Sequence, residues 1–280
     1  MIDGDAQLTE VIGLIPAAGL ATRISPLSGS KELFPVGFRS VTGNDDSRPK
    51  VIAHYLLEKM RFSGISKAYI VLRKGKWDIP SYFGDGAMLD MHLAYLIMNL
   101  PFGAPYTVDQ AYPYVKDAVI ALGFPDIFFE DKDAFSRLLS RQAESKADVV
   151  LGIFPGDQPS KMDMVELDDN NQVSRIEIKP VETILRYTWG IAVWTPNFTK
   201  FMHDFLIRHY SANKEANEGS TSAMHELFLG NVIQAAIENG LRVEAVKISD
   251  TPFIDIGTPD NLMKIIQHFA LKGMEGPTQG

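Results

Sequence analysis

Short apolar runs alternate along the chain with longer segments in which apolar residues recur every three to four positions. The short runs are typical of strands buried on both faces of a sheet, and the longer segments are typical of amphipathic helices. Gly, Pro, Asp and Asn separate the two kinds of segment. The pattern therefore predicts an α/β fold with a Rossmann-like, mixed but mainly parallel sheet flanked by helices.

Spacing and length predict the type of each segment. Strands are expected at 11–17, 67–72, 89–97, 148–154 and 242–248, and helices at 51–62, 115–122, 132–145, 198–208, 222–239 and 261–272. The middle of the chain differs, with short strands expected at 164–167, 173–178 and 191–194 and a hairpin turn at 168–171. Residues 211–222 are polar and predict a surface loop or a mobile lid, and residues 273–280 are expected to fray.

Length and composition predict one compact unit. The chain has 280 residues, of which 45% are hydrophobic and 22% are charged, so it can bury a large core. The helices expected at 198–208 and 261–270 could pack on the sheet or bury an interface in a homo-oligomer. Both alternatives stay open.

Charge and residue types exclude several classes of function. A net charge of −8 with no long basic run argues against nucleic acid or an anionic membrane as the main partner. The chain has no cysteine, which excludes disulfides and cysteine-ligated metals, and its six histidines show no metal-ligand spacing. No basic segment with a following apolar stretch opens the sequence, and no window approaches 18 apolar residues, so a cytoplasmic protein is expected.

The segment after the first expected strand has the chemistry of a phosphate site. Ala17, Ala18 and Gly19 turn the backbone with small side chains, which lets backbone N–H groups approach a phosphate closely. Arg23 and Lys31 add full positive charges, Arg as a bidentate donor and Lys as a point charge. The alternative is an ordinary turn between a strand and a helix, with two solvated cations.

Motifs spread along the chain resemble those of the sugar-1-phosphate nucleotidylyltransferases. Residues 12–36 read IGLIPAAGLATRISPLSGSKELFPV and are similar to the opening signature of these enzymes. The other similar segments are RPKVI (48–52), SYFGDG (81–86), IKP (178–180), GIAVW (190–194) and FIDIGTP (253–259). The resemblance covers nearly the whole chain and implies a divergent member with a glycosyltransferase-A-like fold.

The resemblance also implies how the chain is organised. A single domain of residues 1–280 would have a nucleotide-binding part at about 8–130, a small β-rich sugar-binding part at about 148–260 and a C-terminal helix at about 260–272. The substrates would be a nucleoside triphosphate, with UTP or dTTP as first choice, and a sugar 1-phosphate. Mg²⁺ would be the cofactor.

The matched motifs imply roles for individual residues. The nucleotide would be held by Ala17, Ala18, Gly19, Leu20, Ala21 and Thr22. Arg23 and Lys31 would be the catalytic cations on the phosphates. The acceptor would be held by Lys179, Gly190 and Asp126. Asp255 and Asp126 would bind Mg²⁺, because this ion prefers hard oxygen ligands.

Two of these assignments have an open alternative. Asp255 precedes Gly257 and Pro259, so it could form a turn and cap the following helix instead. Relatives carry the other metal-binding Asp two residues before Ile127, where this chain has Pro125. Either the loop is rearranged so that Asp126 still reaches the metal, or the site has lost a ligand.

Further departures from the family pattern leave the substrate and turnover open. Ala21 replaces a glycine, and Ile178 replaces a glutamate that relatives direct toward the sugar. Residues 114–118, which read YVKDA, are bulkier and more charged than the small stretch that relatives place over the base. The alternatives are a binding or regulatory protein of the same fold, and a transferase for a phosphorylated non-sugar such as an aminoalkyl phosphate.

Overall fold

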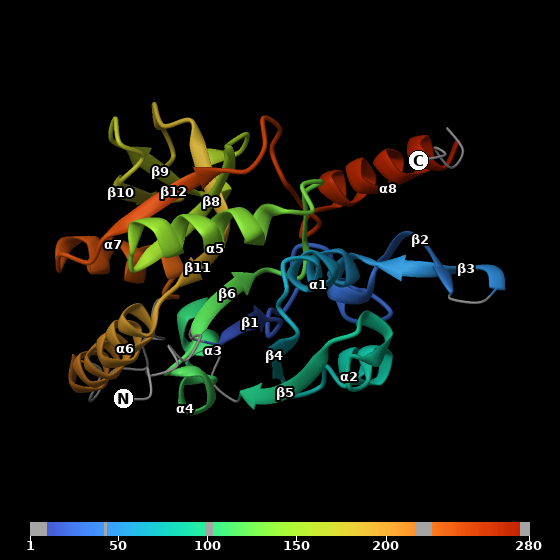
Figure 1. Cartoon of the computed structure of the whole chain (residues 1–280), viewed down its shortest axis with the longest axis horizontal. Coiled ribbons are helices and arrows are strands. Elements are labelled where there is room, and N and C mark those ends of the chain that lie inside the picture. Colours follow the sequence, from blue (N-terminus) through green and yellow to red (C-terminus); the bar gives the residue numbers. More distant parts are fainter. Residues whose placement is uncertain (1–9, 42–43, 99–102, 217–225, 275–280) are drawn as a thin grey trace, which may run out of the picture.

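A central nine-stranded sheet organises the protein, as seen in a computed structural model that describes residues 10–41, 44–98, 103–216 and 226–274 (Figure 1). The main path of the sheet runs through β10 (Val173–Ile178), β9 (Asp163–Leu167), β11 (Tyr187–Trp194), β6 (Val119–Gly123), β1 (Val11–Pro16), β4 (Lys67–Arg73) and β5 (His92–Met98). The two remaining strands are β8 (Val149–Pro155), which pairs with β11, and β12 (Val243–Lys247), which pairs with β8. Within this described sheet, β10 and β11 run against the other strands, which confirms the mixed, mainly parallel α/β fold.

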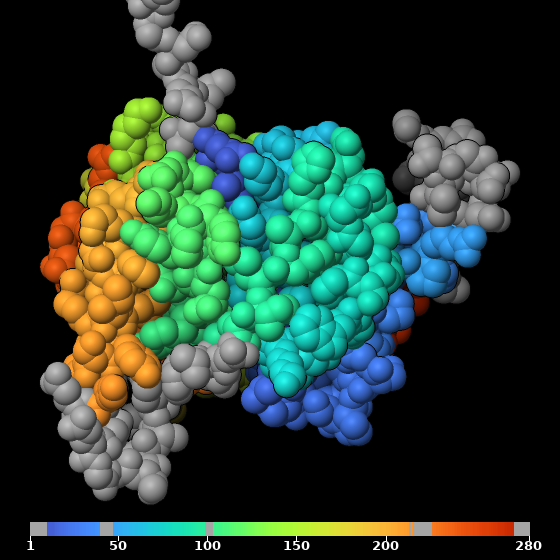
Figure 2. Space-filling view, turned by 90° about the horizontal axis from the view of Figure 1, so that it is seen from below, coloured from blue at the N-terminus to red at the C-terminus, as the bar shows by residue number. Residues whose placement is uncertain are grey.

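Helices cover both faces of this sheet. One face is covered by α1 (Ile52–Phe62), α2 (Asp78–Phe83) and α5 (Ala134–Ser145). The other face is covered by α3 (Ala104–Asp109), α4 (Tyr112–Val115), α6 (Pro196–Ala216) and α7 (Leu229–Glu238). Figure 2 shows α6 in orange beside the green segment that holds α3 and α4. Because both faces are covered, side chains of β1 alternate between two cores, with Leu14 in one and Ile15 in the other.

Two small sheets lie outside the central one. The first is a hairpin of β2 (Pro35–Val41) and β3 (Asn44–Val51), and the second pairs β7 (Ile127–Phe128) with β13 (Ile254–Asp255). The C-terminal helix α8 (Pro259–Met274) follows β13 directly. A third apolar cluster, which includes Val36, Phe128 and Ile265, joins the hairpin, β7 and α8. This cluster fixes β13 and α8 against the body of the protein.

Several sequence predictions need correction. The helix expected at 115–122 is wrong, because Val119–Gly123 form the fully buried strand β6. A short apolar run of this kind has no periodicity that separates a helix from a buried strand. The strand expected at 89–97 begins only at His92, after a single 3-10 turn at Ala87–Leu89.

Two helix boundaries also differ from the prediction. The helix α6 continues to Ala216, so the first half of the expected loop at 211–222 is helical. The helix expected at 222–239 begins at Leu229, because Phe228 is extended at its N-cap position. Residues 217–225 and the expected fraying end at 275–280 lie outside the described residues. None of the helices that the structure describes is long and apolar enough to cross a membrane.

A buried lysine in α1 gives the stability of the protein a distinctive pH dependence. Lys59 is only 7% exposed, and its Nζ lies 4.9 Å from the centroid of the Phe129 ring. Burial lowers the pKa of Lys59 to about 8, below its ordinary value of 10.5. The folded protein therefore releases this proton at a lower pH than the unfolded chain does.

We expect Lys59→Met to stabilise the protein by about 2–3 kcal/mol near pH 7, where the wild type holds a buried charge. The difference in stability between Lys59→Met and the wild type should shrink as the pH rises from 8 to 10.5, because the wild-type lysine becomes neutral in the folded state before it does so in the unfolded chain. Urea unfolding of both proteins across this pH range measures the difference, with the exposed Lys264→Met as control. A difference that is constant with pH would contradict the expectation.

Candidate active site

Two adjoining cavities open at the carboxyl end of β1, where ligands bind in folds of this class. The larger cavity has a volume of about 620 Å³, and the smaller one has a volume of about 260 Å³. They share the lining residues Arg23, Ala104, Phe124, Asp126, Lys161 and Lys179. The two cavities therefore meet at a boundary that includes Arg23 and Asp126.

The loop after β1 forms one wall of the larger cavity. Ala18, Gly19, Leu20, Ala21 and Thr22 all line it, as the sequence predicts. The space beside Gly19 is open, since a Cβ built there would meet nothing within 4 Å. The loop backbone is therefore accessible to a ligand on this side.

Ala17 and Ala21 depart from the expectation for this loop. Ala17 is buried in the core, and its N–H donates to the carbonyl of Val71 at 2.8 Å, so it does not line the cavity. Ala21 stands where relatives have a glycine and has a φ of 55°. This left-handed conformation costs a non-glycine residue roughly 1 kcal/mol. Its carbonyl accepts hydrogen bonds from Ser25 Oγ and Ile24 N–H, which hold the conformation in place.

Lys31 is positioned by a buried polar network. It begins the short 3-10 helix Lys31–Leu33, which the carboxylate of Asp78 fixes by accepting hydrogen bonds from Ser30 N–H at 2.6 Å and Ser30 Oγ at 2.8 Å. The next residue, Glu32, forms a buried ion pair with Lys76 at 2.7 Å. Two anchors thus fix the backbone on either side of Lys31.

The strand pair β7–β13 brings together two carboxylates that are far apart in the sequence. Asp255 pairs with Ile127 in the ladder, and Ile256 N–H donates to the carbonyl of Asp126 at 3.0 Å. Burial raises the pKa of Asp255, and the negative charge of Asp126 raises it further. The loop is thus arranged so that Asp126 reaches the neighbourhood of Asp255, despite Pro125 at the family position.

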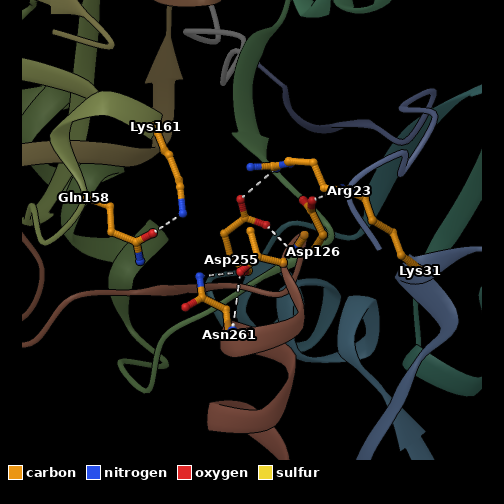
Figure 3. Close-up of polar contacts among 9 residues, drawn as sticks. Arg23, Lys31, Asp126, Gln158, Lys161, Asp255 and Asn261 are labelled. Carbon is orange, nitrogen blue, oxygen red and sulfur yellow. Dashed lines mark hydrogen bonds and ion pairs between the residues drawn. The ribbon is translucent and has the colours of Figure 1, made fainter. Parts of the chain in front are cut away.

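Each of these carboxylates also faces a cation of the β1 loop region (Figure 3). Lys31 Nζ donates to Asp126 Oδ2, and Arg23 Nη2 lies 3.5 Å from Asp255 Oδ2. Burial lowers the pKa of Lys31, but the adjacent Asp126 outweighs this effect, so the pKa is raised overall. Lys31 therefore carries its charge at neutral pH, and the four residues predicted for phosphate and metal form one cluster.

Asp255 uses one carboxylate oxygen in a turn and directs the other toward Arg23. Its Oδ1 accepts a hydrogen bond from Gly257 N–H at 2.7 Å, and its carbonyl accepts one from Asn261 Nδ2 at 2.9 Å. The helix α8 is capped by Thr258, whose Oγ1 accepts from Asn261 N–H at 3.4 Å. Asp255 Oδ2 thus remains directed at the cavity side, toward Arg23.

The donor set fits Mg²⁺. Asp126 and Asp255 offer hard carboxylate oxygens, and their mutual repulsion favours a cation between them. No group of three or more His, Asp or Glu side chains meets in the part of the chain that the structure describes. Mg²⁺ commonly takes one or two carboxylates and completes its shell with phosphate oxygens and water.

The smaller cavity contains the residues predicted for the acceptor. Lys179 lies just after β10, and its Nζ lies 3.5 Å from the centroid of the Phe228 ring. Gly190 contributes space, because a Cβ there would come within 3.0 Å of Phe253 and 3.2 Å of Ile127. The absence of that Cβ lets Phe253 and Ile127 pack closely against β11 at this position.

Sequence reasoning missed several residues that line the two cavities. They are Glu32, Phe124, Gln158, Lys161, Asp163, Phe228 and Asn261. Only Glu32 gave a local signal, because it is a charged residue within a run that is otherwise apolar after Lys31. The other residues come from loops and strand ends whose meeting depends on the tertiary fold.

Comparison with known proteins agrees with this geometry. Residues 12–271 match the nucleotidyl transferase family. The chain belongs to this family. Among individual nucleotidyl transferases, it is 26% identical over 170 residues to the glucose-1-phosphate thymidylyltransferase of Streptomyces antibioticus, and 22% identical over 253 residues to that of Neisseria gonorrhoeae. The matched stretches cover 60% of this chain and 44% of the first relative, and 89% of this chain and 79% of the second.

The fold itself is shared with solved nucleotidyl transferase structures. A UDP-glucose pyrophosphorylase, solved in complex with UDP-glucose, superposes with a TM-score of 0.73 at 14% sequence identity. The superposition covers 94% of this chain and all of that one. At this identity the likeness establishes the fold of the nucleotidyl transferase domain.

Proposed function

We propose that this protein transfers a nucleotidyl group from a nucleoside triphosphate to a sugar 1-phosphate, releasing pyrophosphate. The observation that carries the proposal is the cluster of two cations and two carboxylates between the adjoining cavities. Arg23 and Lys31 face Asp126 and Asp255 there. Family membership supports the same reaction class.

The reaction requires positioning and charge neutralisation more than acid–base chemistry. An oxygen of the sugar phosphate attacks the α-phosphorus and forms a new P–O bond. The bond from the α-phosphorus to the bridging oxygen breaks, and pyrophosphate leaves with that oxygen. Arg23 and Lys31 bind the departing phosphates and offset their charge, while the open backbone around Gly19 holds the nucleotide.

Mg²⁺ would be held by Asp126 and Asp255 and would supply further neutralisation of phosphate charge. The acceptor phosphate would be bound by Lys179, with Lys161 as a second cation in both cavities. In this proposal the acceptor would occupy the smaller cavity and the triphosphate would occupy the larger one.

The test is an incubation of the purified protein with Mg²⁺, each common nucleoside triphosphate and a panel of sugar 1-phosphates, with inorganic pyrophosphatase present. We expect phosphate release that depends on the acceptor, with UTP or dTTP as the donor. Reactions that lack either the acceptor or Mg²⁺ are the controls. If the folded protein released no phosphate with any pair of substrates, the proposal would be overturned. The alternative of a binding protein with the same fold would then be favoured.

A further inference from the structure

Two residues that line the smaller cavity each carry a buried polar atom that has no partner. Asp163 Oδ1 and Trp189 Nε1 are both buried, and neither makes a hydrogen bond within the described structure. Both residues line the cavity, and Trp189 is only 7% exposed. Buried polar groups are nearly always paired, because leaving one unpaired costs about 1–3 kcal/mol. Two such atoms in one cavity wall therefore need an explanation.

The sheet places these two side chains as neighbours. Thr188 on β11 pairs with Met164 on β9, so the register carried one residue further brings Trp189 level with Asp163. The hydrogen bond from Thr188 Oγ1 to the carbonyl of Asp163, at 3.0 Å, holds the strand ends together. Residues at the same level of an antiparallel pair present their side chains on the same face.

The third neighbour at this level is Ile178. It pairs with Asp163 from β10, on the opposite side of β9 from Trp189. A Cβ built on Gly230 would come within 2.5 Å of Asp163 Oδ2 and 2.6 Å of Ile178 Cδ1, so both side chains reach the same space at the start of α7. Ile178 stands where the family pattern has a glutamate. A carboxylate on β9 thus lies beside the position on β10 where the family pattern has one.

The chemistry of the two free atoms selects the ligand group. Asp163 Oδ1 accepts a hydrogen bond, and Trp189 Nε1 donates one. A hydroxyl group can do both in return, whereas an ammonium group has no lone pair to accept from Trp189. We propose that Asp163 and Trp189 together bind a hydroxyl group of the acceptor, which makes the acceptor a hydroxyl-bearing sugar phosphate and not an aminoalkyl phosphate. This inference rests on the proposed function.

Lys179 lines the same cavity as this pair and acts on Asp163 through its charge. Its positive charge lowers the pKa of Asp163, as does the N–H of Gly230, although burial outweighs both and raises that pKa to about 6. The ammonium of Lys179 is held over the Phe228 ring. In the proposed function this ammonium binds the acceptor phosphate, so Lys179 and the Asp163–Trp189 pair would contact one acceptor at two points.

The ionised carboxylate of Asp163 lowers the stability of the folded protein. A role in binding a ligand would explain why the chain keeps it. Because its pKa is raised in the folded state, the charged form destabilises the protein above about pH 6. Asp163→Asn should therefore raise the melting temperature at pH 7.5, and the gain should shrink as the pH falls from 6 toward 4. A side chain that served only to cap α7 would give a lower melting temperature on replacement.

The binding test uses calorimetric titration of UDP-glucose, UDP, dTDP-glucose and dTDP into the folded protein and its variants. We expect Asp163→Asn and Trp189→Phe each to weaken binding of the nucleotide sugar at least tenfold, with affinity for the nucleoside diphosphate unchanged within twofold. The double variant should lose less than the product of the two single losses, because both side chains bind the same hydroxyl. Matched controls are the exposed Asp157→Asn, and Trp194→Phe, whose indole N–H donates to Thr199 Oγ1 at 2.9 Å.

A second pair of variants tests the exchange of the carboxylate between strands. Asp163→Ala should lose nucleotide-sugar affinity, and adding Ile178→Glu should restore at least part of it. If Asp163→Asn and Trp189→Phe both bound the nucleotide sugar with the wild-type affinity, the inference would be overturned while the proposed function would stand. Failure of the wild type to bind any of the four compounds would overturn the inference, and it would also overturn UTP and dTTP as the donors in the proposed function. Turnover of aminoethyl phosphate without turnover of any sugar 1-phosphate would overturn the hydroxyl assignment.

Discussion

Replacing Asp255 with Asn should reduce Mg²⁺-dependent nucleotidyl transfer by at least about 10³-fold. The substitution removes the charge of one of the two carboxylates that face Arg23 and Lys31, while the amide oxygen can still accept from Gly257 N–H. The fold should survive. Burial and Asp126 raise the pKa of Asp255, so its charged form destabilises the folded state at neutral pH, and the neutral amide removes that cost.

Initial rates across a Mg²⁺ titration, together with thermal unfolding at pH 7.5, measure both effects. The control is Asp250→Asn, an exposed carboxylate of the same chain region whose partner is Lys247. Activity of the Asp255 variant within tenfold of the wild type would remove Asp255 from the mechanism. A melting temperature well below that of the wild type would assign it a structural role instead.

Replacing Lys76 with Met should destabilise the protein by about 3–5 kcal/mol. Glu32 and Lys76 are 2% and 3% exposed, and Glu32 Oε2 already lacks a partner, so the variant would leave a buried carboxylate with no counter-charge. Because Glu32 follows Lys31 directly, we also expect a loss of activity at temperatures where the variant is still folded. Urea unfolding and initial rates at 15 °C separate these effects.

The double variant Glu32→Gln/Lys76→Met should recover most of the lost stability, since neither charge remains buried. The matched control is Lys200→Met, which breaks the exposed ion pair with Asp204 and should leave the stability nearly unchanged, because solvent screens this pair. Equal losses for Lys76→Met and Lys200→Met would show that burial does not set the strength of the Glu32–Lys76 pair. A double variant as unstable as Lys76→Met would show that packing, and not charge, decides the result.

The parts of the site that are local in sequence could be predicted, and those that depend on pairing could not. The β1 strand, its small-residue loop and the cations Arg23 and Lys31 lie within 25 residues, so their order alone was informative. Asp126 was assigned to the metal, but whether it reaches that site stayed open, because its position depends on a two-residue ladder with a strand that begins at Ile254. Asp163 could not be predicted, because only the pairing of β9 with β10 and β11 brings it next to Ile178 and Trp189.

The fold shows the same division. The sequence predicted the long amphipathic helices α5 and α8 with boundaries within a few residues of those observed. The strand β6 was mistaken for a helix, since five consecutive buried apolar residues fit either structure. The sequence did not predict the hairpin β2–β3. Its second strand, NDDSRPKV, is polar and contains proline, and such residues are rare in strands.

The joining of β13 and α8 to β7 has a consequence for the order in which the protein matures. Residues 10–216 include the loop after β1, the cations Arg23 and Lys31, and Asp126, yet Asp255 and the helix that anchors it come near the end of the described chain. A ribosome-bound chain therefore acquires its second carboxylate only after almost all other parts of the site have emerged. Synthesis itself delays the completed centre until the surrounding fold can form.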